Sequence, residues 1–390
     1  MPDFDFDGHN TLYATHGLHP FAAKCPPQLV RYALQHYSCA GETVLDPMMG
    51  SGTTLVEARL AARNAKGYDI DPLAQLIARV KSQVLSDVDI QAAYDAVVQR
   101  ARDDLRVIKS GAIPLQFRDR LALPDFQNRD YWFSPEVSTN LALLSYHISE
   151  VDTGPEVRAF LWVAFSSLIL AKKSVASARD IIHSRHHHYQ HSTPPDVMGK
   201  FTARVTKMRR QMAEFSKCCE GKPDVCAEAQ LGDARDLPLE AESIDLVFTS
   251  PPYGTALDYA RAHFLAVAWM EKALGITLPE YKASAPDYIG SERGSLSGDP
   301  TTDDAPNGFN LARSIVSSLS VESMRHARLM HRYFSDMYQA LSEVTRVLKR
   351  GRHAVVVVCP SHVRKVEVPT HEVFCEMAPT IGLSLEAKHT

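Results

Sequence analysis

The stretch TVLDPMMGSGTTLVEARLAARNAKGYDID, residues 43–71, decides the fold of this chain. A short β-type run ends at Asp46, a glycine-rich turn follows, and the amphipathic run LVEARLAAR precedes a second short strand that ends around Asp69 and Asp71. Helical sequence resumes at Pro72, a residue that suits the first turn of a helix. A strand–loop–helix–strand unit of this kind predicts parallel strands joined by a right-handed crossover.

The same alternation returns late in the chain. EAQLGDA (228–234) and the apolar run SIDLVFTS (243–250) are predicted strands, residues 331–348 have helical periodicity, and AVVVVC (354–359) reads as another buried strand. Residues 85–226 are mostly helical in pattern. We therefore predict an α/β fold in which one doubly wound, Rossmann-like sheet carries a large helical insertion.

The composition is that of an ordinary globular protein, with 45% hydrophobic and 23% charged residues among 390. No apolar run approaches the length of a membrane span, and the acidic start MPDFDFDGHN is not a secretory signal. Seven cysteines without regular spacing do not indicate a disulfide framework, so we expect a cytoplasmic protein. The net charge of −4 does not indicate a nucleic-acid binder, although a basic groove can lie on an acidic protein.

The glycine loop between the first strand and helix, DPMMGSGTT, predicts a ligand site. Gly50 and Gly52 let the backbone turn sharply and let a ligand approach it closely. The GxxxxGK[ST] pattern of a phosphate-binding P-loop is absent. Asp69, at the end of the next strand, is placed to accept hydrogen bonds from a ribose diol, and Asp233 to meet an adenine amino group. A helix cap or turn is the alternative for each aspartate, and we expect Asp71 to cap the helix at Pro72.

The segment Thr249-Ser250-Pro251-Pro252-Tyr253 ends a buried strand abruptly, since two successive prolines remove two N–H donors. The hydroxyl of Ser250, the carbonyl of Pro251 and the ring of Tyr253 are suited to hold an aminated heterocycle. A purely structural cis-proline turn is the alternative.

These motifs resemble those of the amino-methylating DNA methyltransferases, which make N4-methylcytosine or N6-methyladenine. DPMMGSGTT is similar to their motif I, TSPPY to motif IV, HPFAAKCPPQL (19–29) to motif X, GYDID to motif II and GDARDLPL to motif III. Ser-Pro-Pro-Tyr is typical of the cytosine-N4 enzymes, whereas Asp or Asn at the first position is typical of the adenine-N6 enzymes. The resemblance covers residues 12–80 and 227–390.

The resemblance implies an S-adenosylmethionine-dependent enzyme that methylates the N4 amino group of a flipped-out cytosine in double-stranded DNA. It implies the catalytic residues Ser250, Pro251, Pro252 and Tyr253. It implies a cofactor site formed by His19, Pro20, Lys24, Asp46, Pro47, Met48, Gly50, Ser51, Gly52, Thr53, Thr54, Asp69, Ile70, Asp233, Ala234 and Thr249. An adenine-N6 or RNA base methyltransferase, and an inactive nucleic-acid-binding module, stay open as alternatives.

The expected domain plan follows from the same resemblance. Residues 1–84 and 227–390 form the catalytic domain, and residues 85–226 form a helical insertion, as part of that domain or as a joined lobe, that is a candidate for target recognition. We expect residues 275–325 to form a mobile loop near the site, since 282–310 are rich in Ser, Gly, Pro and Asp. After the last strand we expect a helix and one strand, GLSLEAK (382–388), in a chain that is shortened relative to the family.

The remaining features concern partners. The candidates for contact with DNA phosphates, for which a solvated helix face is the alternative, are Lys172, Lys173, Arg179, Lys200, Arg204, Lys207, Arg209 and Arg210. The stretch HSRHHHYQH (183–191) is expected to be an exposed polar loop rather than a metal site, and no metal is expected. The resemblance also implies a role in restriction–modification with a partner endonuclease, and a nucleoid-associated location in a prokaryote.

Overall fold

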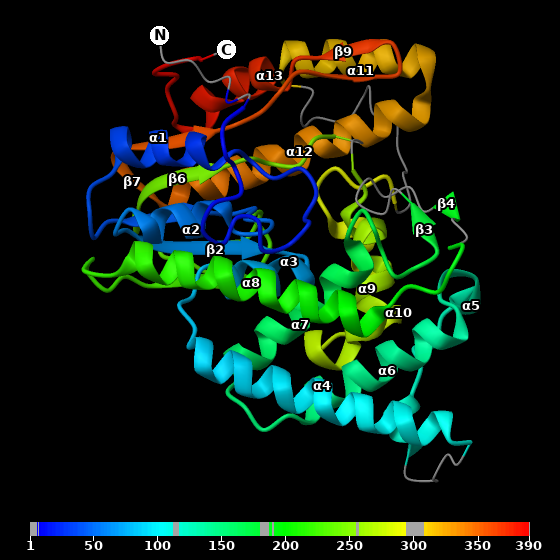
Figure 1. The fold of residues 1–390 in the computed structure, drawn as a ribbon. Coiled ribbons are helices and arrows are strands. Elements are labelled where there is room, and N and C mark those ends of the chain that lie inside the picture. The colour runs from blue at the N-terminus through cyan, green and yellow to red at the C-terminus, as the bar shows by residue number, and fades with distance from the viewer. Residues whose placement is uncertain are drawn as a thin grey trace.

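The computed structural model describes residues 6, 8–111, 117–179, 187–188, 191–254, 257–293 and 308–389. Its centre is a five-stranded sheet in the order β5–β2–β1–β6–β7, and every neighbouring pair is parallel (Figure 1). The strands are β1 (Thr43–Asp46), β2 (Asn64–Asp69), β5 (Ala227–Leu231), β6 (Ile244–Thr249) and β7 (Leu348–Val356). The predicted Rossmann-like sheet is therefore confirmed.

Strand β7 is the one whose limits were predicted least well. It begins at Leu348 rather than at residue 354, and it ends at Val356 rather than at residue 359. Within its first half, Arg350, Gly351 and Arg352 are exposed to solvent, whereas Leu348 is buried. The polar start is tolerated because β7 pairs on one side only, with β6, so that this part of the strand is not enclosed by neighbours.

The two faces of the sheet bury different side chains, because successive residues of a strand point to opposite sides. Val44 of β1 and Phe248 of β6 pack against α1 (Pro27–Tyr37), α2 (Thr53–Leu60) and α3 (Pro72–Lys81). Leu45 and Val247, their neighbours in sequence, pack against the end of α12 (Met324–Val347) on the other face. Helices on both faces explain why β1 and β6 are almost wholly buried.

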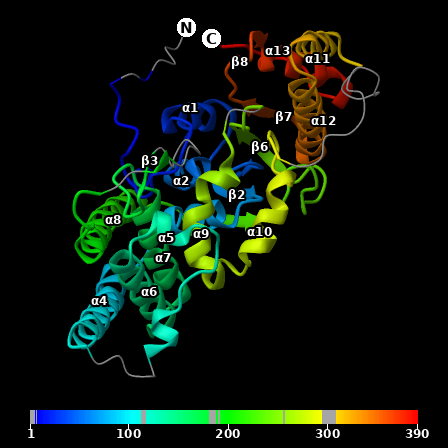
Figure 2. The same ribbon diagram turned by 90° about the vertical axis from the view of Figure 1, so that its right-hand side faces the viewer.

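The helical insertion forms a block beside the α3 face of the sheet (Figures 1 and 2). Its elements are α4 (Asp87–Lys109), η2 (Asp119–Leu121), α5 (Arg129–Trp132), α6 (Pro135–Glu150), α7 (Pro155–Leu170), β3 (Ala178–Arg179), β4 (His187–His188) and α8 (Val197–Cys219). Helix α7 is buried on nearly all sides, because it packs against α3, α8 and α9 (Tyr259–Leu274). The insertion thus shares one continuous apolar core with the sheet domain.

Two short strands interrupt the helical pattern that we predicted for residues 85–226. Strands β3 and β4 pair in an antiparallel manner, Ala178 with His188 and Arg179 with His187. His187 and His188 are therefore part of a small hairpin, rather than of the loop predicted for HSRHHHYQH. The remaining residues of that stretch lie outside the described residues, apart from His191, whose ring lies 3.1 Å from the carbonyl oxygen of Ala176.

Residues 275–325 differ from the single mobile loop that we expected. They contain α10 (Leu278–Ser284), η4 (Ala285–Asp287) and α11 (Asn310–Glu322), while residues 294–307 lie outside the described residues. A capping box between Thr277 and Glu280 fixes the start of α10, and the apolar face of α11 packs against α12. Local capping and a buried face outweigh the loop-like composition of this segment.

The end of the chain also differs from the prediction. A hairpin of β8 (Ser361–Val363) and β9 (Val366–Val368) forms a separate sheet, followed by α13 (Thr370–Met377) and η5 (Ala378–Ile381). GLSLEAK has no regular structure, although a strand was expected there. Its side chains are mostly exposed, so there is no buried face to favour a strand. No helix among the described residues has the length and apolar character that crossing a membrane requires.

Candidate active site

The carboxyl ends of the parallel strands surround a cavity, whose empty volume is about 950 Å³ when the open solvent at its mouth is included. Along the chain, the strands proceed outward from β1 to β2 and β5, and then return to β6 and β7 on the other side. The reversal between β1 and β6 is the position at which open α/β sheets bind ligands. Gly50, after β1, and Ser250, after β6, both line this one cavity.

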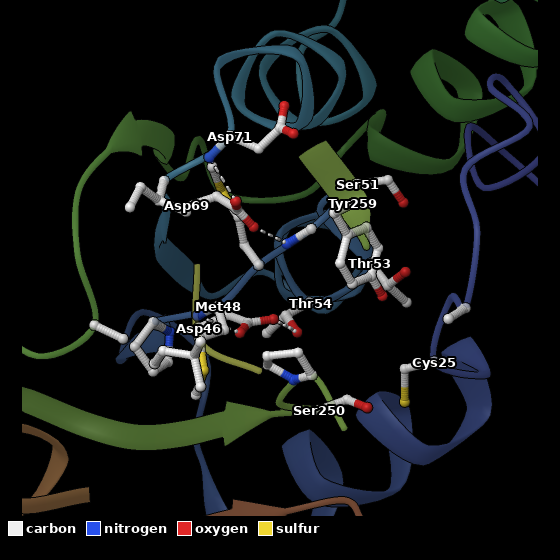
Figure 3. A pocket seen from close by; sticks show the side chains of 18 of the residues that line it. Cys25, Asp46, Met48, Ser51, Thr53, Thr54, Asp69, Asp71, Ser250 and Tyr259 are labelled. Atoms are coloured by element: carbon white, nitrogen blue, oxygen red, sulfur yellow. Dashed lines mark hydrogen bonds between the residues drawn. The ribbon is translucent and has the colours of Figure 1, made fainter. Parts of the chain in front are cut away.

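The glycine loop is held by hydrogen bonds to the ends of its own strands (Figure 3). Asp46 accepts a hydrogen bond from the Thr54 hydroxyl at 2.6 Å and one from the Met48 N–H at 3.2 Å. Gly52 has a left-handed φ of +78°, and a Cβ atom there would lie 2.8 Å from Ala78 of α3. This position requires glycine because the conformation is unfavourable for other residues and the space is filled.

Asp69 joins the glycine loop to the end of β2. Its carboxylate accepts hydrogen bonds from the N–H of Gly50 at 2.8 Å and from the N–H of Asp71 at 2.9 Å. Burial, together with the nearby charge of Asp71, raises the pKa of Asp69 to about 7. Burial likewise raises the pKa of Asp46 to about 6. Both carboxylates line the cavity, so the site holds acids that are costly to ionise until a polar ligand compensates them.

Asp71 caps α3, as the sequence predicted, and it has a further structural role. One oxygen accepts hydrogen bonds from the N–H groups of Leu73 and Ala74. The other lies 2.8 Å from the ring of His263 on α9 and accepts from the hydroxyls of Tyr281 and Tyr288. Burial alone would raise the pKa of Asp71, but these partners outweigh it and the pKa lies below its usual value. Asp71 therefore ties the segment after β2 to the segment that follows β6.

Asp233 follows β5 and lines the cavity with Gly232 and Ala234. Its carboxylate is paired with Arg235, which also lies 2.9 Å from Asp336 on α12. Although burial acts in the opposite direction, this guanidinium holds the pKa of Asp233 below its usual value. The carboxylate is consequently ionised and fixed in place beside the cavity.

The segment after β6 is fixed from the opposite face of the sheet. The Tyr333 hydroxyl on α12 donates to the carbonyl of Pro252 at 3.0 Å. Gly254 packs so closely on Met330 that a Cβ atom would lie 2.8 Å from its sulfur. Ser250 and Pro252 line the cavity, whereas Pro251 is buried and Tyr253 lies beside Cys359, half-buried and outside the lining. Burial and then the Cys359 neighbour raise the pKa of Tyr253.

The segment before α1 contributes a cation. Lys24 lines the cavity, and its ammonium donates to the carbonyls of His16 at 3.0 Å and His19 at 3.3 Å. Burial lowers the pKa of Lys24 to about 8. The ring of His19 does not reach the cavity, since it is fully buried with Nε2 3.1 Å from the Ser166 hydroxyl.

Fourteen of the predicted site residues line the cavity, and six do not. Those in the lining are Lys24, Asp46, Pro47, Met48, Gly50, Ser51, Thr53, Thr54, Asp69, Ile70, Asp233, Ala234, Ser250 and Pro252. Those outside it are His19, Pro20, Gly52, Thr249, Pro251 and Tyr253. Gly52 faces α3, and Thr249 is fully buried at the end of β6. A motif therefore mixes residues that face the ligand with residues that shape the backbone beneath them.

Several wall residues of the cavity lie outside the predicted site. Phe21, Phe248 and Ile289 supply apolar surface, while Tyr259, Asp287 and Tyr288 come from α9, from η4 and from the turn after it. Figure 3 shows the Tyr259 ring near Ser51 and Thr53, with Ser250 and Cys25 across the cavity from Asp69 and Asp71. Of these six wall residues, Tyr259 alone carries a signal in the sequence, because it closely follows the Ser-Pro-Pro-Tyr segment.

The predicted DNA-contacting residues are not equivalent in the structure. Lys172 and Lys173 are exposed after α7, and the Lys200 ammonium donates to the Lys173 carbonyl at 2.6 Å. Arg209 is bound through two nitrogens to Asp87, at 2.6 and 2.7 Å. Arg204, Lys207 and Arg210 lie on α8, where Lys207 and Arg210 are exposed and Arg204 is half-buried. Arg179 is part of β3.

The cavity fits S-adenosylmethionine in the chemistry of its lining. Asp69 and Asp233 offer acceptors for ribose hydroxyls and an adenine amine, Ile70 and Phe248 offer apolar surface, and Lys24 offers a cation for a carboxylate. The glycine loop brings backbone close to the space between them. The fold and the cavity together define a Rossmann-like methyltransferase.

Comparison with known proteins narrows this class. A family model described as DNA methylase, for N6- and N4-methyltransferases, matches residues 7–79. The type II methyltransferase M.MvaI of Kocuria varians is 23% identical over 380 residues, covering 94% of this chain and 82% of that protein. M.BsoBI of Geobacillus stearothermophilus is 22% identical over 257 residues, covering 62% of this chain and 50% of that protein. M.MjaII of Methanocaldococcus jannaschii is 48% identical over 68 residues, covering 17% of this chain and 13% of that protein.

No solved structure matches the chain significantly. The family model and these methyltransferases make the chain similar to the amino-methylating DNA methyltransferases. The methyl donor of that family is S-adenosylmethionine.

Proposed function

We propose that this protein is a type II DNA methyltransferase that transfers a methyl group from S-adenosylmethionine to the N4 amino group of cytosine in double-stranded DNA. One observation carries the proposal: the glycine loop after β1 and the Ser-Pro-Pro-Tyr segment after β6 border a single cavity, so a cofactor and a base can occupy it together. Ser250 at the first position of that segment favours cytosine over adenine, because the adenine-N6 enzymes typically carry Asp or Asn there.

The residues of the chain would act mainly by binding and orientation. Bound S-adenosylmethionine supplies an electrophilic methyl group. The Ser250 hydroxyl oxygen and the Pro251 carbonyl would accept hydrogen bonds from the cytosine amino group, which directs the nitrogen lone pair and stabilises the positive charge that develops on nitrogen. The Tyr253 ring would pack on the extruded base, after a change of position that brings it to the cavity. The proton that leaves the methylated nitrogen passes to water.

Two features support the duplex as substrate. The chain is similar to type II DNA methyltransferases, and exposed lysines lie on the insertion at Lys172, Lys173 and Lys207. Neutral substitution of Lys172 and Lys173 should reduce the salt dependence of DNA binding by about one counterion for each lost phosphate contact. Arg209→Gln is the matched control, because the charge of Arg209 is already compensated by Asp87. If the wild type, the lysine variant and Arg209→Gln all showed the same salt dependence of DNA binding, Lys172 and Lys173 would not contact DNA phosphates.

The product of the reaction tests the proposal directly. Duplex DNA is incubated with the protein and S-adenosylmethionine, digested to nucleosides and analysed by mass spectrometry, with RNA as a parallel substrate. We expect N4-methyldeoxycytidine as the product. The Ser250→Ala variant is the negative control and should form little of it. N6-methyldeoxyadenosine or a methylated ribonucleoside would contradict the cytosine assignment, and wild-type binding of DNA without any methylated product would indicate a binding module.

The biological role follows as a proposal from the similar proteins, which are named type II methyltransferases. We propose that the methyl group protects a recognition sequence from a partner endonuclease, with both proteins acting on the DNA of a prokaryotic cell. Sequencing that detects modified bases, applied to DNA from cells expressing the chain, would identify the methylated sequence. Resistance of that DNA to an endonuclease cutting the same sequence would support the role, and unchanged cleavage would contradict it.

A further inference from the structure

Lys81 is a buried lysine in an unusual position. It is the last residue of α3, its side chain is 0% exposed, and its ammonium donates to the Ser51 hydroxyl oxygen at 3.3 Å. None of the ion pairs found among the described residues involves Lys81. A buried ammonium without a negative partner is costly, because burial removes its hydration and nothing compensates the charge.

The titratable groups around Lys81 do not supply that negative charge. Glu57 acts on the same His16 ring as Lys81 does, but its carboxylate already binds Tyr13, His16 and Arg31. Burial lowers the pKa of His16 to about 4 and that of His19 well below its usual value, so both rings are neutral. Lys24 is a second cation. Burial, with Lys24 adding to it, lowers the pKa of Lys81 well below its usual value.

Ser51 connects this cation to the cavity. It belongs to the glycine loop and lines the cavity, as Lys24 does, whereas Lys81 lies behind it. In its protonated form Lys81 has donors only, so the Ser51 oxygen is then the acceptor of their hydrogen bond. The Ser51 hydroxyl proton is then left to donate to another acceptor, and the cavity is where a ligand would provide one. This corner of the cavity therefore presents donors and positive charge, which suit an anionic oxygen.

We propose that Lys81 is a positioning residue that makes the Ser51 corner a carboxylate site for the amino-acid end of the cofactor. This inference rests on the proposed function, since S-adenosylmethionine carries one carboxylate, at the end opposite its adenine. The carboxylate would accept from Ser51 and supply the negative charge that Lys81 lacks. Lys81 would thus select a cofactor that carries a carboxylate over one that does not.

Calorimetric binding of two ligands without DNA tests the inference. S-adenosylmethionine and decarboxylated S-adenosylmethionine differ in the carboxylate alone, so the ratio of their dissociation constants reports recognition of that group. We expect Lys81→Met to weaken binding of S-adenosylmethionine about tenfold or more, and binding of the decarboxylated ligand less than about twofold. Ser51→Ala should likewise bring the two dissociation constants closer together. It provides the test if Lys81→Met does not fold.

Arg79→Met is the matched control, because Arg79 is a cation on the same helix that pairs with Glu156 at 3.3 Å, outside the cavity lining. It should leave both dissociation constants unchanged. The role of Lys81 would be overturned if Lys81→Met and Ser51→Ala kept the wild-type ratio of dissociation constants, or if they weakened the binding of both ligands equally. Either result would leave the proposed function intact. A wild-type protein that binds neither ligand would overturn the proposed function and this inference together.

Discussion

The two halves of the cavity are held in place in different ways. The cofactor half is held by hydrogen bonds within residues 46–71: the Thr54 hydroxyl donates to Asp46, and the N–H groups of Gly50 and Asp71 donate to Asp69. The base half, Ser250–Gly254, is fixed by distant parts of the chain, namely Tyr333 and Met330 on α12 and the turn at Gly290. The comparison teaches that the glycine loop is positioned mainly by local sequence, whereas the base half is positioned by tertiary packing. Substitutions in one half should therefore leave the other half nearly unaffected.

The largest expected effect comes from removing the groups proposed to hold the base. Ser250→Ala should lower the rate of methyl transfer about a hundredfold, because it removes an acceptor for the amino group in the transition state. Tyr253→Ala should lower it as well, through loss of stacking. The dissociation constant of S-adenosylmethionine, measured by calorimetry, should stay within about twofold of wild type. Wild-type turnover in both variants would show that the base is held elsewhere.

A smaller effect, on cofactor binding rather than on the rate of methyl transfer, is expected at Asp69. Asp69→Asn should weaken S-adenosylmethionine binding about tenfold, since a charged acceptor for the ribose hydroxyls becomes neutral. The rate at saturating cofactor and DNA should change little, because Asp69 belongs to the cofactor half. Steady-state kinetics at varied cofactor concentration separates KM from kcat. A fall in kcat with an unchanged KM would contradict the division between the two halves.

The pH dependence of cofactor binding provides a related test. Burial and Asp71 raise the pKa of Asp69 to about 7, and ribose hydroxyls would donate to its ionised form. Protonation therefore competes with the cofactor as the pH falls, and affinity should drop by up to about tenfold for each pH unit below 7. Calorimetry between pH 6 and pH 7.5 measures this slope, which should disappear in Asp69→Asn. The same slope in that variant would assign the titration to another group.

The smallest expected effect concerns the support of the base half from the opposite face of the sheet. Tyr333→Phe removes the hydroxyl that donates to the Pro252 carbonyl, with little change in packing, so turnover should fall about threefold to tenfold with cofactor affinity unchanged. Tyr338→Phe, which removes a hydroxyl farther along α12, is the control and should behave as wild type. Equal turnover in the two variants would mean that the prolines alone fix this turn.

Prediction from the sequence succeeded where the pattern and the contacts are local. The limits of β1 and the capping role of Asp71 follow from neighbouring residues, and the glycine loop could be placed between its strand and its helix for the same reason. Prediction was less successful for residues 275–325, where composition indicated a loop but α10 and α11 form. It also missed the wall residues Phe21, Asp287 and Tyr288, since they reach the cavity only when separate segments pack together.

The sequence by itself determined the parallel sheet, the order of its motifs and the edge at which those motifs gather. These depend on hydrophobic periodicity and on turns within a few residues, which any short segment of the chain carries. Only the tertiary structure decided which motif residues face the cavity, that Arg209 is bound to Asp87, and that Lys81 lies buried behind Ser51. Burial and charge pairing join residues that are distant along the chain, so they appear only after the helices have packed against the sheet.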